Sequence, residues 1–150
     1  MRPIIRYIKK LGAQELGYRR GKLTTGQYIY ISKSAVFFFP LLSSQITNDT
    51  ARIVLHREDS SVPAEASYVW HNDKLSEPDG TRNEYRLYLN RDVAYDDYFF
   101  RPGDIVIFEK AHDKGKAHYY MKQYRETDPE YQELSEKVRK SKIRGDHALE

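Results

Sequence analysis

Apolar and polar residues alternate along much of the chain, in short runs separated by glycine, proline and small polar residues. A period of two is typical of strands that bury one face. The pattern predicts strands over residues 3–11, 27–31, 51–58, 66–71, 84–90, 105–109 and 118–125. Seven short strands joined by turns predict an all-β fold, a small barrel. Thirteen tyrosines favour the same fold, because aromatic side chains pack well on pleated surfaces.

Two short helices are expected within the barrel, over residues 35–39 and 92–100. The first contains three consecutive phenylalanines, which cannot share one face, so we expect it to plug one end of the barrel before Pro40 ends it. Residues 127–142 predict a polar helix, with acidic residues first and basic residues last.

These patterns divide the chain into a barrel domain, 1–126, and a C-terminal helix or linker, 127–150. We interpret Leu149 and Glu150 as the remnant of an expression tag, in which case the chain is a fragment of a larger protein.

A chain of 150 residues suits one domain with a sizeable core. The net charge is only +3, but residues 1–33 contain eight basic residues and one acid, Glu15, which leaves the rest of the chain at −4. A basic segment of this kind favours an anionic partner. The absence of cysteine suits a cytoplasmic protein, and no apolar run is long enough to span a membrane.

Residues 79–86 form the most informative stretch, Asp-Gly-Thr-Arg-Asn-Glu-Tyr-Arg, a turn that continues into strand-like alternation. Arginine donates to guanine, asparagine pairs with adenine, and glutamate accepts from the amino group of cytosine in the DNA major groove. The candidate base-contacting residues are Thr81, Arg82, Asn83, Glu84 and Arg86. An ordinary solvated turn with surface ion pairs would have a similar composition.

Residues 12–26 predict a long loop with four glycines, a length that is uncommon in a compact domain unless the loop is functional. The candidate contacts to phosphates or bases in and beside this loop are Arg19, Arg20, Lys22, Thr24, Thr25 and Gln27. Neither glycine motif typical of nucleotide binding is present, and we reject that function.

The sequence offers no convincing catalytic centre. The five histidines lack the spacing of metal ligands, and no aspartate or glutamate has a lysine two residues later, as a metal-dependent nuclease motif needs. We therefore predict no catalytic residue, no metal site and no cofactor in this segment.

Three stretches resemble the N-terminal effector domain of EcoRII-type restriction endonucleases: residues 7–11, 26–32 and above all Gly-Thr-Arg-Asn-Glu-Tyr-Arg at 80–86. Residues 31–40 and the Pro-Gly-Asp stretch at 102–109 resemble the related plant B-three domain of auxin-response-type transcription factors. Together these matches span roughly residues 5–125.

The resemblance implies a DNA-binding pseudobarrel of seven strands and two helices. Two arms, an N-arm (residues 12–27) and a C-arm (residues 74–86), would hold duplex DNA from the major-groove side. The residues at 81–84 and Arg86 would contact bases, whereas Leu23 and Thr24 stand where the family has a more polar pair.

The resemblance also implies a partner domain and a target. A nuclease domain requiring Mg²⁺ would follow the barrel, as in a monomeric member of the family, and the whole would act in bacterial restriction–modification. The target would be a short G·C-rich pseudopalindrome of the CC(A/T)GG type. The alternatives are a transcription-factor-like or RNA-binding barrel, a Mg²⁺-dependent nuclease complete in this chain, and a protein-interaction barrel.

Overall fold

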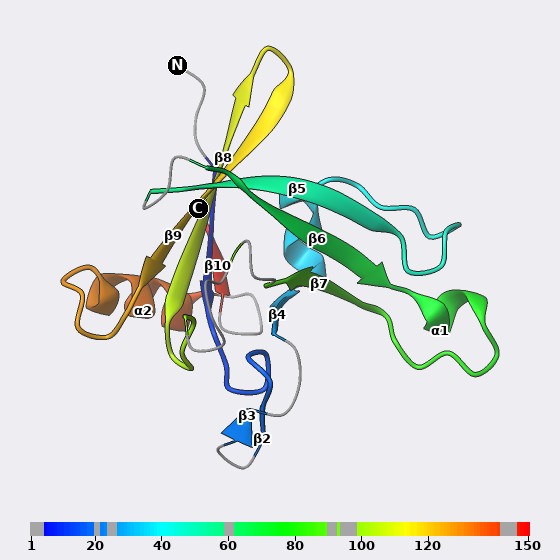
Figure 1. Ribbon diagram of the computed structural model, residues 1–150, viewed down its shortest axis with the longest axis horizontal. Helices are drawn as coiled ribbons and strands as arrows, with labels where there is room; N and C mark the ends of the chain where they lie inside the picture. The colour runs from blue at the N-terminus through cyan, green and yellow to red at the C-terminus, as the bar shows by residue number, and fades with distance from the viewer. Residues whose placement is uncertain are drawn as a thin grey trace.

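The computed structural model describes residues 5–19, 22–23, 27–58, 62–89, 93, 99–141 and 147–150, with only the backbone of residues 19, 22 and 23. One curled sheet of eight strands, in the order β10-β1-β8-β9-β5-β6-β7-β4, forms most of the molecule (Figure 1). Its strands are β1 (Ile5–Lys10), β4 (Tyr28–Ile31), β5 (Thr50–Arg57), β6 (Ala64–His71), β7 (Glu84–Tyr88), β8 (Ile105–Asp113), β9 (Lys116–Tyr124) and β10 (His147–Leu149).

The predicted all-β pseudobarrel is confirmed, but the main sheet has eight strands rather than seven. The additional strand is β10, which pairs with β1 from Tyr7↔Leu149 to Lys9↔His147. A second sheet, the ribbon of β2 (Tyr18–Arg19) and β3 (Lys22–Leu23), lies within the N-arm. Strands of two or three residues are too short to show a period of two, so pattern analysis does not detect them.

The barrel interior is filled from one end by η1 (Lys33–Phe38), a 3₁₀-helix that begins two residues before the short helix expected over 35–39 and ends one residue earlier. Ser32 begins it by accepting a hydrogen bond from the Ser34 amide through Oγ at 3.2 Å. Phe38 and Phe39 are fully buried in the main core, whereas Phe37 is 57% exposed. The predicted plugging role is therefore confirmed for two of the three phenylalanines.

The C-terminal helix α2 (Tyr131–Lys140) is shorter than expected and packs against the outer side of the sheet. Its three buried apolar side chains form a second core cluster with residues of β1, β8 and β10: Ile8, Ile105, Ile107, Tyr131, Leu134, Val138 and Ala148. The Glu150 carboxylate makes ion pairs with Arg6 at 3.0 Å and Lys137 at 2.7 Å. The terminal residues interpreted as a tag remnant thus take part in the sheet, and the division at residue 126 stays a prediction.

Most of the second predicted helix, residues 92–100, lies outside the described residues; of this stretch, Val93 and Phe100 are buried in the core. The tip of the β8–β9 hairpin is a tight turn, in which Lys114 and Gly115 both have positive φ, 50° and 80°. Within the described part of the chain, no helix is long and apolar enough to cross a membrane.

Candidate nucleic-acid interface

The two predicted arms leave the sheet at opposite ends of one strand pair. The N-arm runs into the start of β4, and the projecting part of the C-arm runs into the start of β7. These strands are antiparallel, with Tyr28 opposite Tyr88 and Ile31 opposite Tyr85, so the start of each lies beside the end of the other. Figure 1 accordingly shows the β2–β3 ribbon and the α1 segment projecting in different directions from this pair.

The outward face of the β4–β7 pair lies between the arms. Ile29, Ile31 and Leu87 point into the core, and alternation therefore turns their neighbours outward. We call these neighbours the inter-arm surface: Tyr28, Tyr30, Glu84, Arg86 and Tyr88. All five are half-buried.

The Arg86 guanidinium is the centre of the inter-arm surface. It lies over the Tyr28 ring, 4.2 Å from its centroid, and 5.7 Å from that of Tyr30. Its Nη2 donates to Glu84 Oε1 at 2.8 Å, and Nη1 donates to the Tyr88 hydroxyl at 3.4 Å. Burial acts to lower the pKa of Arg86, but the bonds to Glu84 and Tyr88 outweigh it and raise that pKa, so the group stays charged.

His71, at the end of β6, extends this cluster. Its Nε2 lies 2.7 Å from the Tyr88 hydroxyl, and its ring is largely buried. Burial, together with the charges of Arg82 and Arg86, lowers the pKa of His71 below its ordinary value. The imidazole is therefore neutral at neutral pH, and the positive charge of the surface comes from arginine.

The base of the N-arm depends on a buried ion pair. Lys9 Nζ lies 2.9 Å from Glu15 Oε1, and both side chains are buried. The same carboxylate accepts hydrogen bonds from the amides of Gly12 at 3.0 Å and Tyr30 at 2.8 Å. Glu15 therefore joins the N-arm to β4, and Lys9 is not an exposed cation available to a partner.

Among the predicted N-arm contacts, the structure places three. Arg19 and Lys22 face each other in the β2–β3 ribbon as backbone partners. Gln27 Nε2 donates to the Leu16 carbonyl at 3.2 Å, so this side chain helps to hold the base of the arm. Arg20, Thr24 and Thr25 lie outside the described residues.

The C-arm is held in shape by Asp73 at the start of the short helix α1 (Asp73–Ser76). Its carboxylate accepts from the Thr81 amide at 3.3 Å and lies 3.5 Å from Arg82 Nε, while the Lys74 amide donates to the Arg82 carbonyl at 3.0 Å. Burial acts to raise the pKa of Asp73, but the Thr81 amide and the Arg82 charge hold it below its usual value. Arg82 and Thr81 are thus presented on a defined backbone.

Gly80 allows the two sides of the C-arm to approach closely. A Cβ atom at this position would lie 2.0 Å from the Asp73 carbonyl oxygen. The sequence motif suggested a glycine needed for the backbone conformation of a turn. In the described residues, however, the glycines with positive φ are Gly17, Gly103 and Gly115, and Gly80 is not one of them. The requirement at Gly80 is therefore space, not backbone conformation.

The substitution Gly80→Ala is expected to separate the two sides of the C-arm. Because the Lys74 amide then loses its bond to Arg82, its hydrogen exchange should accelerate roughly fivefold, the effect of losing about 1 kcal/mol. Exchange measured by NMR tests this, with Gly12→Ala as the control, since the nearest atom to a Cβ there, Glu15 Oε1, lies at 3.5 Å, an ordinary van der Waals contact. Unchanged Lys74 exchange in Gly80→Ala would contradict the close approach.

Sequence reasoning missed two residues that support the C-arm. Asn72 is buried; its Oδ1 accepts from the Asn48 amide at 2.8 Å, and its Nδ2 donates to the Ile46 carbonyl at 3.0 Å. Trp70 stacks on Tyr85 at 5.0 Å and donates from Nε1 to Asn83 Oδ1 at 2.9 Å. The Asn83 oxygen is thus used within the arm.

The tyrosines of the inter-arm surface were also missed as site residues. Tyrosine alternates with isoleucine at residues 28–31, a pattern that places Tyr28 and Tyr30 on one face of a strand. This alternation was the only sign in the sequence that the two tyrosines share a surface. Pairing of β4 with β7, which brings them to Arg86, joins residues nearly sixty positions apart and cannot be inferred from local pattern.

The curled sheet with two arms at opposite ends of one strand pair defines a B3-like pseudobarrel. Among solved structures, the UbaLAI restriction endonuclease B3 domain, crystallised with cognate DNA, is similar: 18% sequence identity, a TM-score of 0.53, and coverage of 80% of this chain and 67% of that chain. No protein-family model matches the chain, and no curated protein matches it by sequence. The resemblance drawn from residues 80–86 and the other motifs is thereby confirmed for the fold.

Proposed function

We propose that this chain binds duplex DNA in a sequence-specific manner, with both arms entering from the major-groove side. The observation that carries the proposal is the placement of Arg86 and the tyrosines between two arms that leave opposite ends of the β4–β7 pair. The four residue pairs of this ladder span roughly 10 Å, comparable with the major groove, which is about 12 Å wide. The similar UbaLAI domain was solved with cognate DNA, which supports the proposal.

The C-arm residues have complementary roles in this proposal. Thr81 and Arg82 lie on the projecting part of the arm and meet the DNA first. Because Trp70 occupies the Asn83 oxygen, Asn83 offers its amide NH₂ group to a base acceptor. Arg86 and Glu84, already paired with each other, present a donor and an acceptor side by side, as a G·C pair requires.

The wider role that we propose is that of a target-recognition or effector domain in a type II restriction endonuclease. A nuclease domain covalently linked after the barrel, with its own Mg²⁺, would cleave DNA, the protein would act as a monomer, and the target would be of the CC(A/T)GG type. A stand-alone transcription-factor-like or RNA-binding barrel is the alternative function.

A gel-shift titration tests the proposal on a CC(A/T)GG duplex, a scrambled duplex and the RNA duplex of the same sequence, at a fixed ~0.1 M salt. We expect a preference of about 10³-fold or more for the specific DNA duplex, the lower range of true site recognition. Equal binding to both DNA duplexes would refute the CC(A/T)GG target but still support DNA binding. Preference for RNA would establish the alternative, and no binding to any duplex would refute the proposal.

The substitution Lys22→Ala is expected to weaken binding to specific and scrambled DNA alike, because a lysine on the N-arm ribbon would contact phosphate rather than a base. The slope of log affinity against log salt concentration should fall in magnitude by about 0.9, one released counterion. Titrations at several salt concentrations measure this slope. A loss confined to the specific duplex would instead assign Lys22 to base contact.

A further inference from the structure

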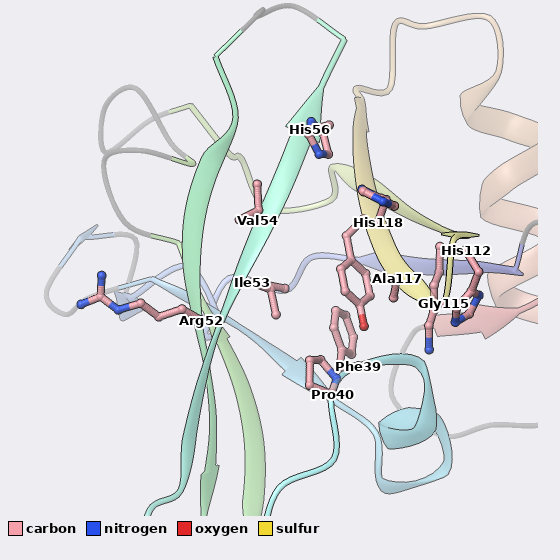
Figure 2. A pocket seen from close by; sticks show the side chains of 12 residues that line it. Phe39, Pro40, Arg52, Ile53, Val54, His56, His112, Gly115, Ala117 and His118 are labelled. Carbon is pink, nitrogen blue, oxygen red and sulfur yellow. The ribbon is translucent and has the colours of Figure 1, made fainter.

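A cleft of about 450 Å³ opens between β5 and the β8–β9 hairpin. In Figure 1 this hairpin projects away from the β2–β3 ribbon and the α1 segment, so the cleft belongs to a different side of the molecule. In Figure 2, β5 contributes Ile53 and His56 to one wall, the hairpin contributes Ala117 and His118 to the other, and Phe39 and Pro40 lie between them.

The cleft exists because two parallel strands separate. β5 and β9 pair over only three positions, Leu55↔Tyr119 to Arg57↔Met121. Towards the N-terminal ends of the two strands, residues 50–54 of β5 pair with β6, and residues 116–118 of β9 pair with β8. In the described structure neither stretch has a strand partner on its other edge, which faces the cleft. Open strand edges of this kind accept an additional strand.

The side chains around the cleft are basic. Arg52, Lys110 and three histidines, His56, His112 and His118, line it, and none of the described lining residues is an aspartate or a glutamate. The His56 and His118 rings are close, with centroids 6.3 Å apart. The Arg52 guanidinium is already paired, with Glu65 on β6 at 3.2 Å.

Lys110, the other lysine or arginine of the cleft, is less exposed than Arg52. Its Nζ lies 5.7 Å from the Phe38 ring centroid and 6.0 Å from that of Tyr119, and it donates to the Phe37 carbonyl at 3.3 Å. Burial lowers the pKa of Lys110. A carboxylate placed beside this ammonium would compensate its partial loss of water.

We propose that this cleft binds an extended acidic segment of a partner protein, which adds as a strand along the open edge of β5 at residues 50–54. The backbone of the segment pairs with β5, one face of it covers the apolar base of the cleft at Phe39 and Ile53, and its carboxylates meet Lys110 and His118. This site is separate from the arms and does not depend on DNA binding.

Fluorescence polarisation with labelled, end-blocked octapeptides tests the proposal at ~0.1 M salt. The alternating Glu-Val peptide is expected to bind. A Lys-Val peptide of opposite charge is expected not to bind, and neither is a Glu-Val peptide N-methylated at every backbone amide, which keeps the side chains but has no amide donor for strand pairing. Equal binding of the Glu-Val and N-methylated peptides would overturn strand addition, and equal binding of the Glu-Val and Lys-Val peptides would overturn the preference for an acidic segment.

Variants locate the site. Lys110→Met should weaken Glu-Val binding by about threefold, the range of one partly exposed charge pair, and His118→Ala should weaken it by removing a hydrogen-bond donor, whereas Arg139→Ala on α2 should leave it unchanged. In the unmodified protein, the amide NMR signals of residues 50–54 should shift on binding, and excess duplex DNA should not displace the peptide. Shifts confined to the arms, displacement by DNA or by inorganic phosphate, or an unchanged affinity in both cleft variants would refute the proposal.

Discussion

Replacing Glu15 with glutamine is expected to lower the free energy of unfolding by about 3–5 kcal/mol, the cost of leaving a buried charge without its partner. The Glu15 carboxylate lies 2.9 Å from Lys9 Nζ and accepts from the amides of Gly12 and Tyr30. A glutamine side chain has one carbonyl oxygen for these three donors, and its NH₂ group would face another donor. Urea unfolding followed by circular dichroism measures the loss.

The matched control is Glu65→Gln on β6, which removes a carboxylate from the exposed pair with Arg52. That change should cost less than about 1 kcal/mol, as exposed pairs do. The double variant Lys9→Met, Glu15→Leu should recover part of the stability lost in Glu15→Gln, because no unpaired charge remains buried. If Glu15→Gln destabilised the protein no more than Glu65→Gln, the pair would not support the fold.

Replacing Arg86 with alanine is expected to reduce affinity for the specific duplex by about 5- to 150-fold, or 1–3 kcal/mol, with little change on scrambled DNA. The change removes the donor group at the centre of the inter-arm surface, uncovers the Tyr28 ring, and leaves the Glu84 carboxylate without its cation. Paired titrations on specific and scrambled duplexes measure the difference. Arg82→Ala should act in the same direction.

Two comparisons make the Arg86 result interpretable. Arg139 lies on α2, paired with Glu136, and Arg139→Ala removes one arginine without changing either arm, so it should leave both affinities unchanged. Arg86→Lys keeps the charge but loses the planar, forked donor group, so it should recover little of the specific affinity lost in Arg86→Ala and leave the affinity for scrambled DNA unchanged. An equal loss on both duplexes in Arg86→Ala would make Arg86 a phosphate contact.

The strands of the main sheet were predictable wherever alternation lasted at least four residues. β5, for instance, begins and ends within one residue of the predicted 51–58. The elements that were not predicted are stabilised by contacts distant in sequence. β10 exists through pairing with β1, and α1 has only four residues, which is less than an isolated helix needs.

For the candidate site, the sequence indicated side-chain chemistry but not how the side chains are paired. Arg82, Asn83, Glu84 and Arg86 were identified from their types, and the structure shows that each already has a partner within the protein. Those partners lie on other strands, on α1 or two residues away on β7. The eight basic residues counted within residues 1–33 likewise include Lys9, because its burial beside Glu15 depends on the tertiary fold and cannot be read from the sequence.

The register of the β4–β7 ladder fixes the spacing between the two arms separately from the side chains that the C-arm presents. A slip of β4 by one residue against β7 would turn Ile29 and Ile31 outward and Tyr28 and Tyr30 into the core, so the spacing between the arms cannot drift gradually. Residues 77–83 lie before the ladder and are not fixed by its register, although Asp73 and Trp70 hold Thr81, Arg82 and Asn83 and Gly80 has no room for a side chain. If the proposed function holds, a library randomised at 77–79 and 81–83 is expected to change the base preference of the C-arm while the spacing between the arms stays constant.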